Sequence, residues 1–297
     1  RVLTPAPIGI LDEEIAEEGS RDPIRLVRPD ALALAFPPRP WDAHKGDFGR
    51  VGVVGGARGT LGAPILAGYG AMAAGAGLVY LGLEKHLVPE AAGAHPALMI
   101  HPEDALPEAD AYVVGCGWGR GARQKALLAA LLERPAPLVL DADALRLLSE
   151  DSALADRLRA RKASSVLTPH PGEAAALLGE ASARAVQQDR VRAVRAIAAR
   201  FGAIAVLKGA HTLIATPTGE VLLCPISAPQ LAQGGTGDVL AGVIGALLAR
   251  RAHPLSPPDA AAAAVWLHAE AGRRMRGLSP MELARTIAEM RRRAEGA

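Results

Sequence analysis

A glycine-rich turn in the last third of the chain carries the residues best suited to chemistry. Residues 233–240 have the sequence QGGTGDVL, in which Gly234, Gly235 and Gly237 lie close together. Because glycine lacks a Cβ, it adopts positive φ angles, so successive backbone N–H groups can turn toward one point and bind an anion. The following segment, 239–248, is apolar with helical spacing, which places the turn at the positive end of a helix dipole. We predict a phosphate site here.

The same turn supplies a candidate acid–base group. Asp238 directly follows the last glycine, at the start of the predicted helix. A carboxylate beside a bound phosphate adds little to binding, but it can accept a proton from a group that attacks the phosphorus atom. Capping of the helix is the structural alternative, and the short motif alone does not separate the two roles. The motifs elsewhere in the chain favour catalysis.

Short apolar strands alternating with helices must position this turn. Apolar runs with few charges occur at residues 51–54, 78–83, 111–114, 138–140, 166–167 and 204–207. Helical patterns separate most of them, which predicts an α/β fold with a central, mostly parallel sheet covered by helices on both faces. In such sheets, ligand-binding groups gather at the carboxyl ends of the strands. Residues 212–215 and 221–224 predict a hairpin immediately before the phosphate turn.

Two glycine-rich turns follow predicted strands. Residues 55–63, GGARGTLGA, do not have the GxGxxG spacing of a dinucleotide fingerprint, so we expect no Rossmann cofactor site. Residues 115–119, GCGWG, follow the strand 111–114. Their glycines allow a ligand to approach the backbone closely, although a plain turn explains them nearly as well.

Charged side chains follow three further strands. Asp141 and Asp143, in LDADAL, are placed to bind a hydroxyl or a cation, or to cap a helix. Glu173, in TPHPGE, lies in the first turn of a predicted helix, where it complements the helix dipole and also suits a water-mediated magnesium contact. Lys208 follows the strand 204–207 and can meet phosphate oxygens. Each residue alone is more often structural, so the prediction depends on their order.

In order along the chain, the motifs are GG, GxGxG, DAD, TPHPGE, LKG and GGTGD. This order resembles the ADP- or ATP-dependent NAD(P)H-hydrate dehydratases, a family often fused to an NAD(P)H-hydrate epimerase, and the match spans His44 to about Gly272. The resemblance implies a ribokinase-like fold and a hydro-lyase that returns the S form of hydrated NADH and NADPH to the intact cofactors, a metabolite repair reaction. ADP is the expected phosphoryl donor, releasing AMP and phosphate, with ATP as the alternative donor and Mg²⁺ as cofactor.

The resemblance also implies roles for individual residues. Asp238 is the expected catalytic base and contacts the substrate. The expected nucleotide-binding residues are Lys208, Thr212, Gly234, Gly235, Thr236 and Gly237. The other expected substrate-binding residues are Ala63, Gly117, Asp143 and His170. Glu173 is the expected magnesium residue.

Several positions depart from the family pattern. Ser227 and Ala228 stand where Gly-Asn is usual before the phosphate turn. Cys116 and Trp118 replace the commoner Pro and Leu in the second glycine-rich turn. These departures bear on individual residues and leave the family resemblance intact.

Composition limits the partners and the cellular location. Basic and acidic residues nearly balance, 33 against 31, and the basic residues are dispersed apart from residues 291–293, so we expect no nucleic-acid partner. Cys116 and Cys224 can form at most one disulfide, too few to stabilise a chain of 297 residues. This low cysteine content favours a reducing, cytoplasmic location. Residues 59–83 contain no charged residue, but their glycines indicate a helix and a strand rather than a membrane span.

The head of the chain differs from the body. Residues 1–40 combine prolines with an acidic run and predict a linker-like segment before a dehydratase domain at residues 41–297. This head resembles the linker that follows an epimerase domain in fused members, so we expect an epimerase domain or partner. The resemblance further implies a homo-oligomer.

Two other functions remain open from the sequence. A small-molecule kinase of the same superfamily, acting on a thiazole or a pyrimidine, shares the GTGD chemistry and would yield a stable phosphorylated alcohol. A non-catalytic nucleotide-binding protein would retain nucleotide affinity without turnover. Asp238 argues against the second alternative.

Overall fold

The computed structural model describes residues 24–93, 95–275, 277 and 279–296. Its centre is a ten-stranded sheet with the strand order β1-β10-β9-β8-β7-β6-β5-β2-β3-β4. Neighbouring strands are parallel, except that β9 is antiparallel to both β8 and β10. The predicted mostly parallel sheet and the predicted hairpin before the phosphate turn are therefore confirmed.

The strand bounds agree closely with the apolar runs of the sequence. The strands are β1 (Ile24–Leu26), β2 (Arg50–Val54), β3 (Leu78–Leu83), β4 (Met99–Pro102), β5 (Ala111–Val114), β6 (Leu138–Leu140), β7 (Ser165–Leu167), β8 (Ile204–Leu207), β9 (Leu213–Ala215) and β10 (Val221–Leu223). β1 and β4 were not predicted. They are short edge strands whose residues are exposed or half-buried, so neither has the continuous apolar run that marks a central strand.

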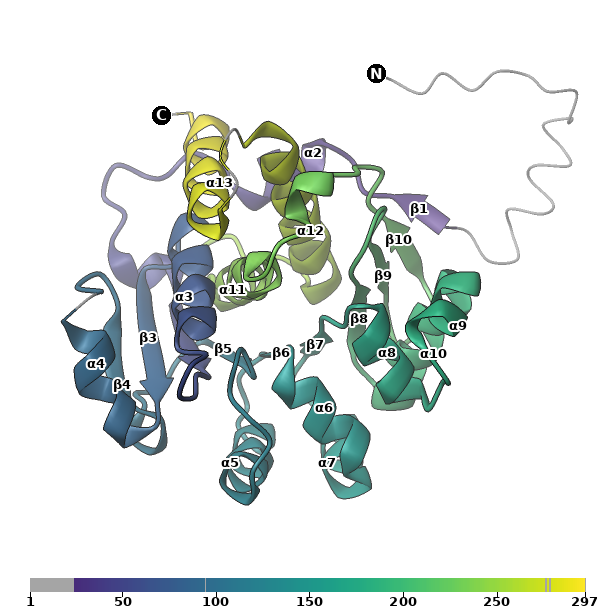
Figure 1. Ribbon diagram of the computed structural model, residues 1–297. Helices are drawn as coiled ribbons and strands as arrows, with labels where there is room; N and C mark the ends of the chain where they lie inside the picture. The colour runs from purple at the N-terminus through teal and green to yellow at the C-terminus, as the bar shows by residue number, and fades with distance from the viewer. Residues whose placement is uncertain (1–23, 94, 276, 278, 297) are drawn as a thin grey trace, which may run out of the picture.

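Helices cover both faces of the sheet. They are α2 (Asp30–Ala35), α3 (Gly62–Ala73), α4 (Val88–Ala92), α5 (Ala122–Leu132), α6 (Asp143–Glu150), α7 (Ser152–Arg159), α8 (Pro171–Leu178), α9 (Ala183–Gln188), α10 (Arg190–Phe201), α11 (Thr236–Ala249), α12 (Pro257–Arg274) and α13 (Pro280–Ala294). Short 3₁₀ turns occur at Lys45–Phe48, Lys85–Leu87, Glu103–Ala105 and Pro229–Leu231. In Figure 1, α3, α11, α12 and α13 lie on one face, and α5, α6, α7, α8 and α10 lie on the other.

Close helix packing replaces aromatic side chains in the core. α11 is buried along most of its length because α3, α12 and α13 surround it. A Cβ on Gly242 of α11 would overlap the carbonyl oxygen of Ala67 in α3, and a Cβ on Gly70 would overlap that of Val239. Small residues therefore let α3 and α11 approach closely. Only 3% of the residues are aromatic, so the core is filled by closely packed helices instead of large rings. The contact between α3 and α11 fixes the amino end of α11 relative to the sheet.

Part of the N-terminal segment belongs to the fold. β1 pairs in parallel with β10, and Ala35 and Phe36 at the end of α2 are buried beside α12. The Arg250 guanidinium donates a hydrogen bond to the Ala35 carbonyl. In its described part, the linker-like segment predicted for residues 1–40 thus includes packed structure, which its proline-rich composition did not indicate. Residues 1–23 of that prediction lie outside the described residues.

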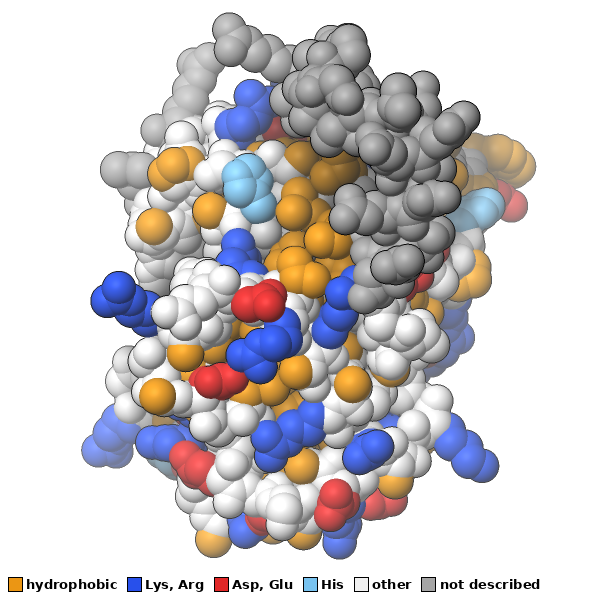
Figure 2. Space-filling view, turned by 90° about the vertical axis from the view of Figure 1, so that its right-hand side faces the viewer, with side chains coloured by type: hydrophobic (Ala, Val, Ile, Leu, Met, Phe, Trp, Pro, Cys, Tyr) orange, Lys and Arg blue, Asp and Glu red, His pale blue; other side chains and the backbone are white. Residues whose placement is uncertain are grey.

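The long uncharged segment forms a helix and a strand, as predicted. Residues 59–83 contain α3, which packs against the sheet, and β3, which is one of its strands. Within the described ranges, we find no helix with both the length and the apolar character that crossing a lipid bilayer requires. Figure 2 shows acidic and basic side chains interspersed with apolar ones on one face of the molecule.

Candidate active site

Residues that follow four neighbouring strands meet at one edge of the sheet. Gly115 follows β5, Asp141 follows β6, Thr168 follows β7 and Lys208 follows β8, and these four strands are parallel neighbours. The amino end of α11 faces the same edge, since Asp238 interacts with both Asp141 and Lys208. The carboxyl ends of these strands and the start of α11 together form the site, as expected for a parallel α/β sheet.

The glycine-rich turn at residues 233–237, before α11, has the geometry of an anion site. Gly235 has a φ of 94° and is the N-cap of α11, so the helix begins at Thr236. Its first helical hydrogen bond runs from the N–H of Val239 to the Gly235 carbonyl. The N–H groups of the preceding helical residues have no partner within the helix and carry the positive end of its dipole. A side chain at Gly234 would meet no atom within 4 Å, so this part of the turn is open.

The Thr236 side chain holds the turn instead of facing its open side. Its hydroxyl lies 2.8 Å from the Leu231 carbonyl and 3.0 Å from the Gln233 carbonyl, and it is a donor to both. Nε2 of His268, on α12, lies 2.8 Å from the Thr236 carbonyl oxygen. Burial lowers the pKa of His268 to about 4, so the ring is neutral and Nε2 can donate to this carbonyl. The Thr236 hydroxyl and carbonyl are therefore both engaged within the protein, and its predicted contact with the nucleotide stays a prediction.

Asp238 lies in the first turn of α11 and is partly buried. Since Gly235 is the N-cap, the capping role weighed for Asp238 does not describe its position. Burial, reinforced by the nearby Asp141 carboxylate, raises the pKa of Asp238 to about 6. A carboxylate with this pKa is mostly ionised at neutral pH, yet basic enough to accept a proton during a reaction.

A buried cation connects the carboxylates of the site. Nζ of Lys208 donates to Oδ1 of Asp141 at 2.7 Å and lies 4.0 Å from Oε2 of Glu173. Burial alone would lower the pKa of Lys208, but the two carboxylates outweigh it and raise the pKa. Lys208 is therefore a fixed positive charge beside the phosphate turn, where a Cβ on Gly237 would lie 3.2 Å from Nζ.

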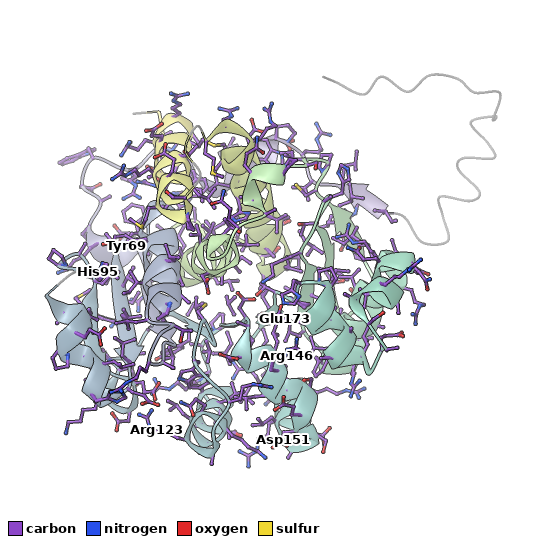
Figure 3. All side chains as sticks on the ribbon, in the orientation of Figure 1. Tyr69, His95, Arg123, Arg146, Asp151 and Glu173 are labelled. Atoms are coloured by element: carbon purple, nitrogen blue, oxygen red, sulfur yellow. The ribbon has the colours of Figure 1, made fainter. Side chains whose placement is uncertain are left out.

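Glu173 and His170 form a capping box at the start of α8. Nδ1 of His170 accepts from the N–H groups of Gly172 and Glu173, at 3.0 and 3.2 Å. Oε2 of Glu173 accepts from the His170 N–H at 2.8 Å, and Oε1 lies 3.3 Å from Nε2 of the same ring. Burial raises the pKa of Glu173, although Lys208 opposes this shift. Figure 3 labels Glu173 at the start of α8, toward the middle of the molecule.

The predicted substrate residues Ala63, Gly117 and Asp143 lie around one turn. Gly117 has a φ of 58°, and a Cβ there would come within 3.1 Å of the Ala63 side chain. The Thr60 hydroxyl donates to the Gly117 carbonyl at 2.8 Å, which connects the turn at residues 55–63 to the turn at residues 115–119. Oδ2 of Asp143 accepts from the Gly119 N–H at 2.8 Å. The turns at residues 55–63 and 115–119 and the start of α6 therefore contact one another here.

Thr212 lies in the turn between β8 and β9. Its hydroxyl donates to the Gly209 carbonyl at 3.1 Å, so it stabilises the turn that follows Lys208. Among the described hydrogen bonds, none joins Thr212 to another predicted site residue. Its predicted contact with the nucleotide stays a prediction.

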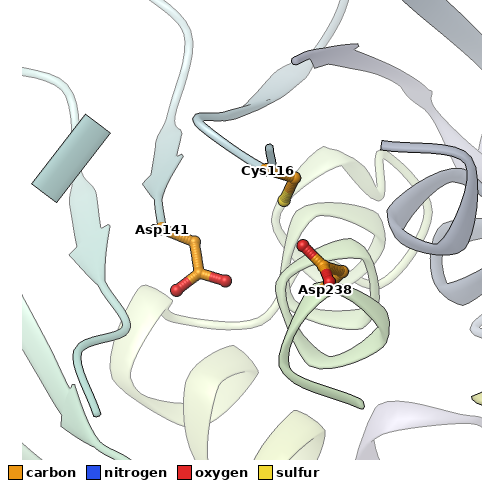
Figure 4. A group of neighbouring side chains, drawn as sticks. All are labelled: Cys116, Asp141 and Asp238. Carbon is orange, nitrogen blue, oxygen red and sulfur yellow. The ribbon is translucent and has the colours of Figure 1, made fainter. Parts of the chain in front are cut away.

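The family resemblance implied no site role for two residues that lie at the centre of the site. Asp141 was noted as a strand-end carboxylate, but its central position follows from Lys208, which lies 67 residues further along the chain. Cys116 is fully buried, and its Sγ lies within 4.8 Å of carboxylate oxygens of Asp141 and Asp238. Figure 4 shows these three side chains. One sequence signal was available for Asp141. It precedes Asp143 in the DAD motif. The structure adds that Ala142, between the two, has a φ of 48°, which L-residues rarely adopt.

Comparisons with known proteins agree with this geometry. A family model described as NAD(P)H-hydrate dehydratase matches residues 51–289. The chain belongs to this family. Among its NAD(P)H-hydrate dehydratase relatives, the ADP-dependent (S)-NAD(P)H-hydrate dehydratase of Neisseria meningitidis is 45% identical over 249 residues, which cover 80% of this chain and 82% of the relative.

Longer relatives and solved structures match as well. The bifunctional NAD(P)H-hydrate repair enzyme of Coxiella burnetii is 40% identical over 84% of this chain, which spans 50% of that relative. The ADP/ATP-dependent NAD(P)H-hydrate dehydratase of Bacillus subtilis, co-crystallised with ATP and Mg²⁺, superposes with a TM-score of 0.79 at 27% identity, covering 92% of this chain and 99% of that one. A ribokinase-like superfamily protein from Enterococcus faecalis gives a TM-score of 0.79 at 25% identity, covering 92% and 97%. The predicted ribokinase-like fold is confirmed.

Proposed function

We propose that this chain dehydrates the S form of hydrated NADH and NADPH in a reaction driven by a nucleotide, with ADP as the phosphoryl donor. The name of the Neisseria relative, at 45% identity, supports both the substrate and the donor. The observation that carries the mechanism is the position of Asp238, a carboxylate with a raised pKa at the glycine-rich start of α11. This position places a proton acceptor beside an anion site.

The first step transfers a phosphoryl group to the substrate. Asp238 accepts the proton of the hydrate hydroxyl as that oxygen attacks the terminal phosphorus atom of ADP, and the bond from this phosphorus to the bridging oxygen breaks, releasing AMP. The N–H groups at the start of α11 and the Lys208 ammonium stabilise the negative charge on the transferred group. Asp141 holds Lys208 in position through the 2.7 Å ion pair.

The second step eliminates phosphate. Hydroxide is a poor leaving group at neutral pH, whereas phosphate leaves readily once the hydroxyl oxygen carries it. The lone pair of the ring nitrogen expels the phosphate, and loss of a proton from the neighbouring ring carbon restores the double bond of the intact cofactor. Ala63, Gly117, Asp143 and His170 are the residues that we propose to line the hydrate.

Glu173 fits a water-mediated contact with Mg²⁺ better than direct coordination. Both of its carboxylate oxygens already face N–H groups of His170, at 2.8 and 3.3 Å, which restricts the directions left for a short metal bond. The buried carboxylate nevertheless orients water at the edge of the nucleotide site. When bound, Mg²⁺ would neutralise charge on the nucleotide phosphates.

We also propose the wider setting of the enzyme. The chain spans about half of the bifunctional repair enzymes, which supports an epimerase domain or partner acting on the same metabolite. Two unpaired cysteines support a cytoplasmic location, and the family resemblance supports a homo-oligomer. We retain residues 41–297 as the dehydratase domain, with β1 and α2 attached to its edge. Light scattering of the purified protein tests the oligomer.

Recovery of NADH tests the reaction. The protein is mixed with Mg²⁺ and hydrated NADH, together with ADP, ATP or no nucleotide, and absorbance is followed at the nicotinamide band. We expect recovery with ADP, formation of one AMP per NADH, and no recovery without nucleotide. A stable phosphorylated hydrate would indicate a kinase instead, and nucleotide binding without either product would indicate a silent binding protein.

A further inference from the structure

The proposed reaction does not use the thiol of Cys116, although this thiol lies at the centre of the site. Cys116 stands between Gly115, with a φ of 114°, and Gly117, with a φ of 58°. Its carbonyl accepts from the Gly56 N–H at 2.9 Å, and a Cβ on Gly55 would lie 2.5 Å from that carbonyl oxygen. The turn is therefore fixed against the end of β2, and this backbone directs the side chain inward, where it is 0% exposed.

The surroundings of the thiol make it a hydrogen-bond donor. Burial, followed by the nearby carboxylates of Asp238 and Asp141, raises the pKa of the Cys116 thiol well above its ordinary value, so it keeps its proton. Asp141 already accepts a hydrogen bond from the Lys208 ammonium. The Asp238 carboxylate, which has an oxygen within 4.8 Å of Sγ, is therefore the acceptor left for the S–H of Cys116. Figure 4 shows the three side chains together.

We propose that Cys116 is a positioning residue, whose S–H orients the Asp238 carboxylate toward the substrate hydroxyl and favours its ionised form. This inference rests on the proposed function, since the role of Asp238 as the base is part of that function. The charged groups that face Asp238 are Asp141 from the end of β6, which opposes its ionisation, and Lys208 from the end of β8, which favours it. His268 of α12 lies behind the turn and is neutral.

Two other roles for the thiol fit the site less well. Sγ and the two carboxylates could in principle hold a metal ion, but the Lys208 ammonium already neutralises Asp141, which disfavours a second cation. A nucleophilic or redox role requires a thiolate that reagents can reach. Cys116 is protonated and fully buried, so it meets neither condition.

The pH dependence of kcat/KM for the hydrate tests the proposal. Cys116→Ala removes the donor, so ionised Asp238 loses a stabilising contact and the acidic limb should move to higher pH by about half to one unit, since S–H is a weak donor. Cys116→Ser keeps a donor in nearly the same shape and should restore most of the wild-type profile. The matched control is Cys224→Ala, which removes the other buried cysteine and should leave the limb unchanged.

A second measurement does not depend on turnover or on the folding of a Cys116 variant. Cys116 and Cys224 are the two cysteines of the chain, so the Cys224→Ala protein has Cys116 as its single thiol. Its infrared S–H stretching band should shift as pH passes through the titration of Asp238, and it should also shift in the added Asp238→Asn variant.

The outcomes separate this inference from the proposed function. If the wild-type protein recovers no NADH but the S–H band responds to Asp238, the proposed function fails while the contact stands. If the wild type is active, and Cys116→Ala keeps the wild-type acidic limb while the band ignores both pH and Asp238→Asn, the positioning role of Cys116 is overturned.

Discussion

Nζ of Lys208 lies 2.7 Å from Oδ1 of Asp141, and both residues directly follow the last residue of a parallel strand. A charge placed in a largely buried position is costly unless it is paired. Asp141 supplies that pairing, so Lys208 stays charged in the free enzyme and is available to an incoming phosphate. The proposed nucleotide site is in this sense organised before a nucleotide binds.

Loss of the Lys208 charge should weaken nucleotide binding. Lys208→Met keeps the length of the stem and removes the ammonium, and we expect the Kd for ADP to rise roughly tenfold or more, as for other charge-assisted hydrogen bonds. Titration calorimetry measures this change. Lys45→Met, on an exposed 3₁₀ turn that precedes β2, is the control and should bind ADP as the wild type does. Equal affinities for all three proteins would exclude Lys208 from the nucleotide site.

Removal of the Glu173 charge should change the requirement for Mg²⁺. Glu173→Gln keeps an oxygen that can accept from the His170 N–H, so the start of α8 should remain folded. We expect the Mg²⁺ concentration for half-maximal rate to rise several-fold, while ADP affinity without Mg²⁺ changes little. Glu180→Gln, just beyond the end of the same helix, is the matched control. An unchanged Mg²⁺ requirement would argue against the assignment of Glu173.

The rate should depend on the ionisation of Asp238. Its pKa is raised to about 6, and the base acts only when ionised, so kcat/KM should be constant above this pH and fall as pH decreases through it. Asp141→Asn removes the neighbouring negative charge that helps to raise this pKa. The acidic limb should therefore move to lower pH, opposite to the shift expected for Cys116→Ala. A limb that Asp141→Asn leaves in place would mean that another group controls the profile.

Close contact between α3 and α11 should control stability. A Cβ on Gly242 would overlap the backbone of Ala67, so Gly242→Ala should force the two helices apart and destabilise the fold by about 3 kcal/mol. Urea denaturation followed by circular dichroism measures the loss. Gly93→Ala is the control, because a Cβ there meets no atom within 4 Å and the residue has a negative φ. Equal midpoints for the two variants would contradict the packing described for α11.

The sequence predicts the fold well where burial is continuous. β5, β6 and β8 begin and end at the predicted residues because both of their faces are covered, which leaves an uninterrupted apolar run. β1 and β4 were missed because edge strands lack that signal. α2 was missed because its buried surface consists of Ala35 and the following Phe36, too little to give a helical pattern.

The sequence predicts the location of residues near the site better than it predicts the contacts of their side chains. The structure brings Asp238, Lys208 and Glu173 together at one edge of the sheet, and their roles there stay predictions. The sequence did not indicate that Thr236 uses its hydroxyl within the turn, which depends on the carbonyls of Leu231, at the end of the preceding 3₁₀ turn, and of Gln233. Nor did it indicate that the Cys116 side chain points inward, a direction set by positive φ angles at both neighbours.

Asp238→Asn tests the central claim most directly. The amide has nearly the same shape as the carboxylate but cannot accept the hydroxyl proton, so NADH recovery with ADP and Mg²⁺ should fall by about 10²–10⁴-fold. The Kd for ADP, measured on the same preparation, should stay within a few-fold of the wild-type value. Near-normal recovery of NADH by this variant would contradict the role of Asp238 as the base.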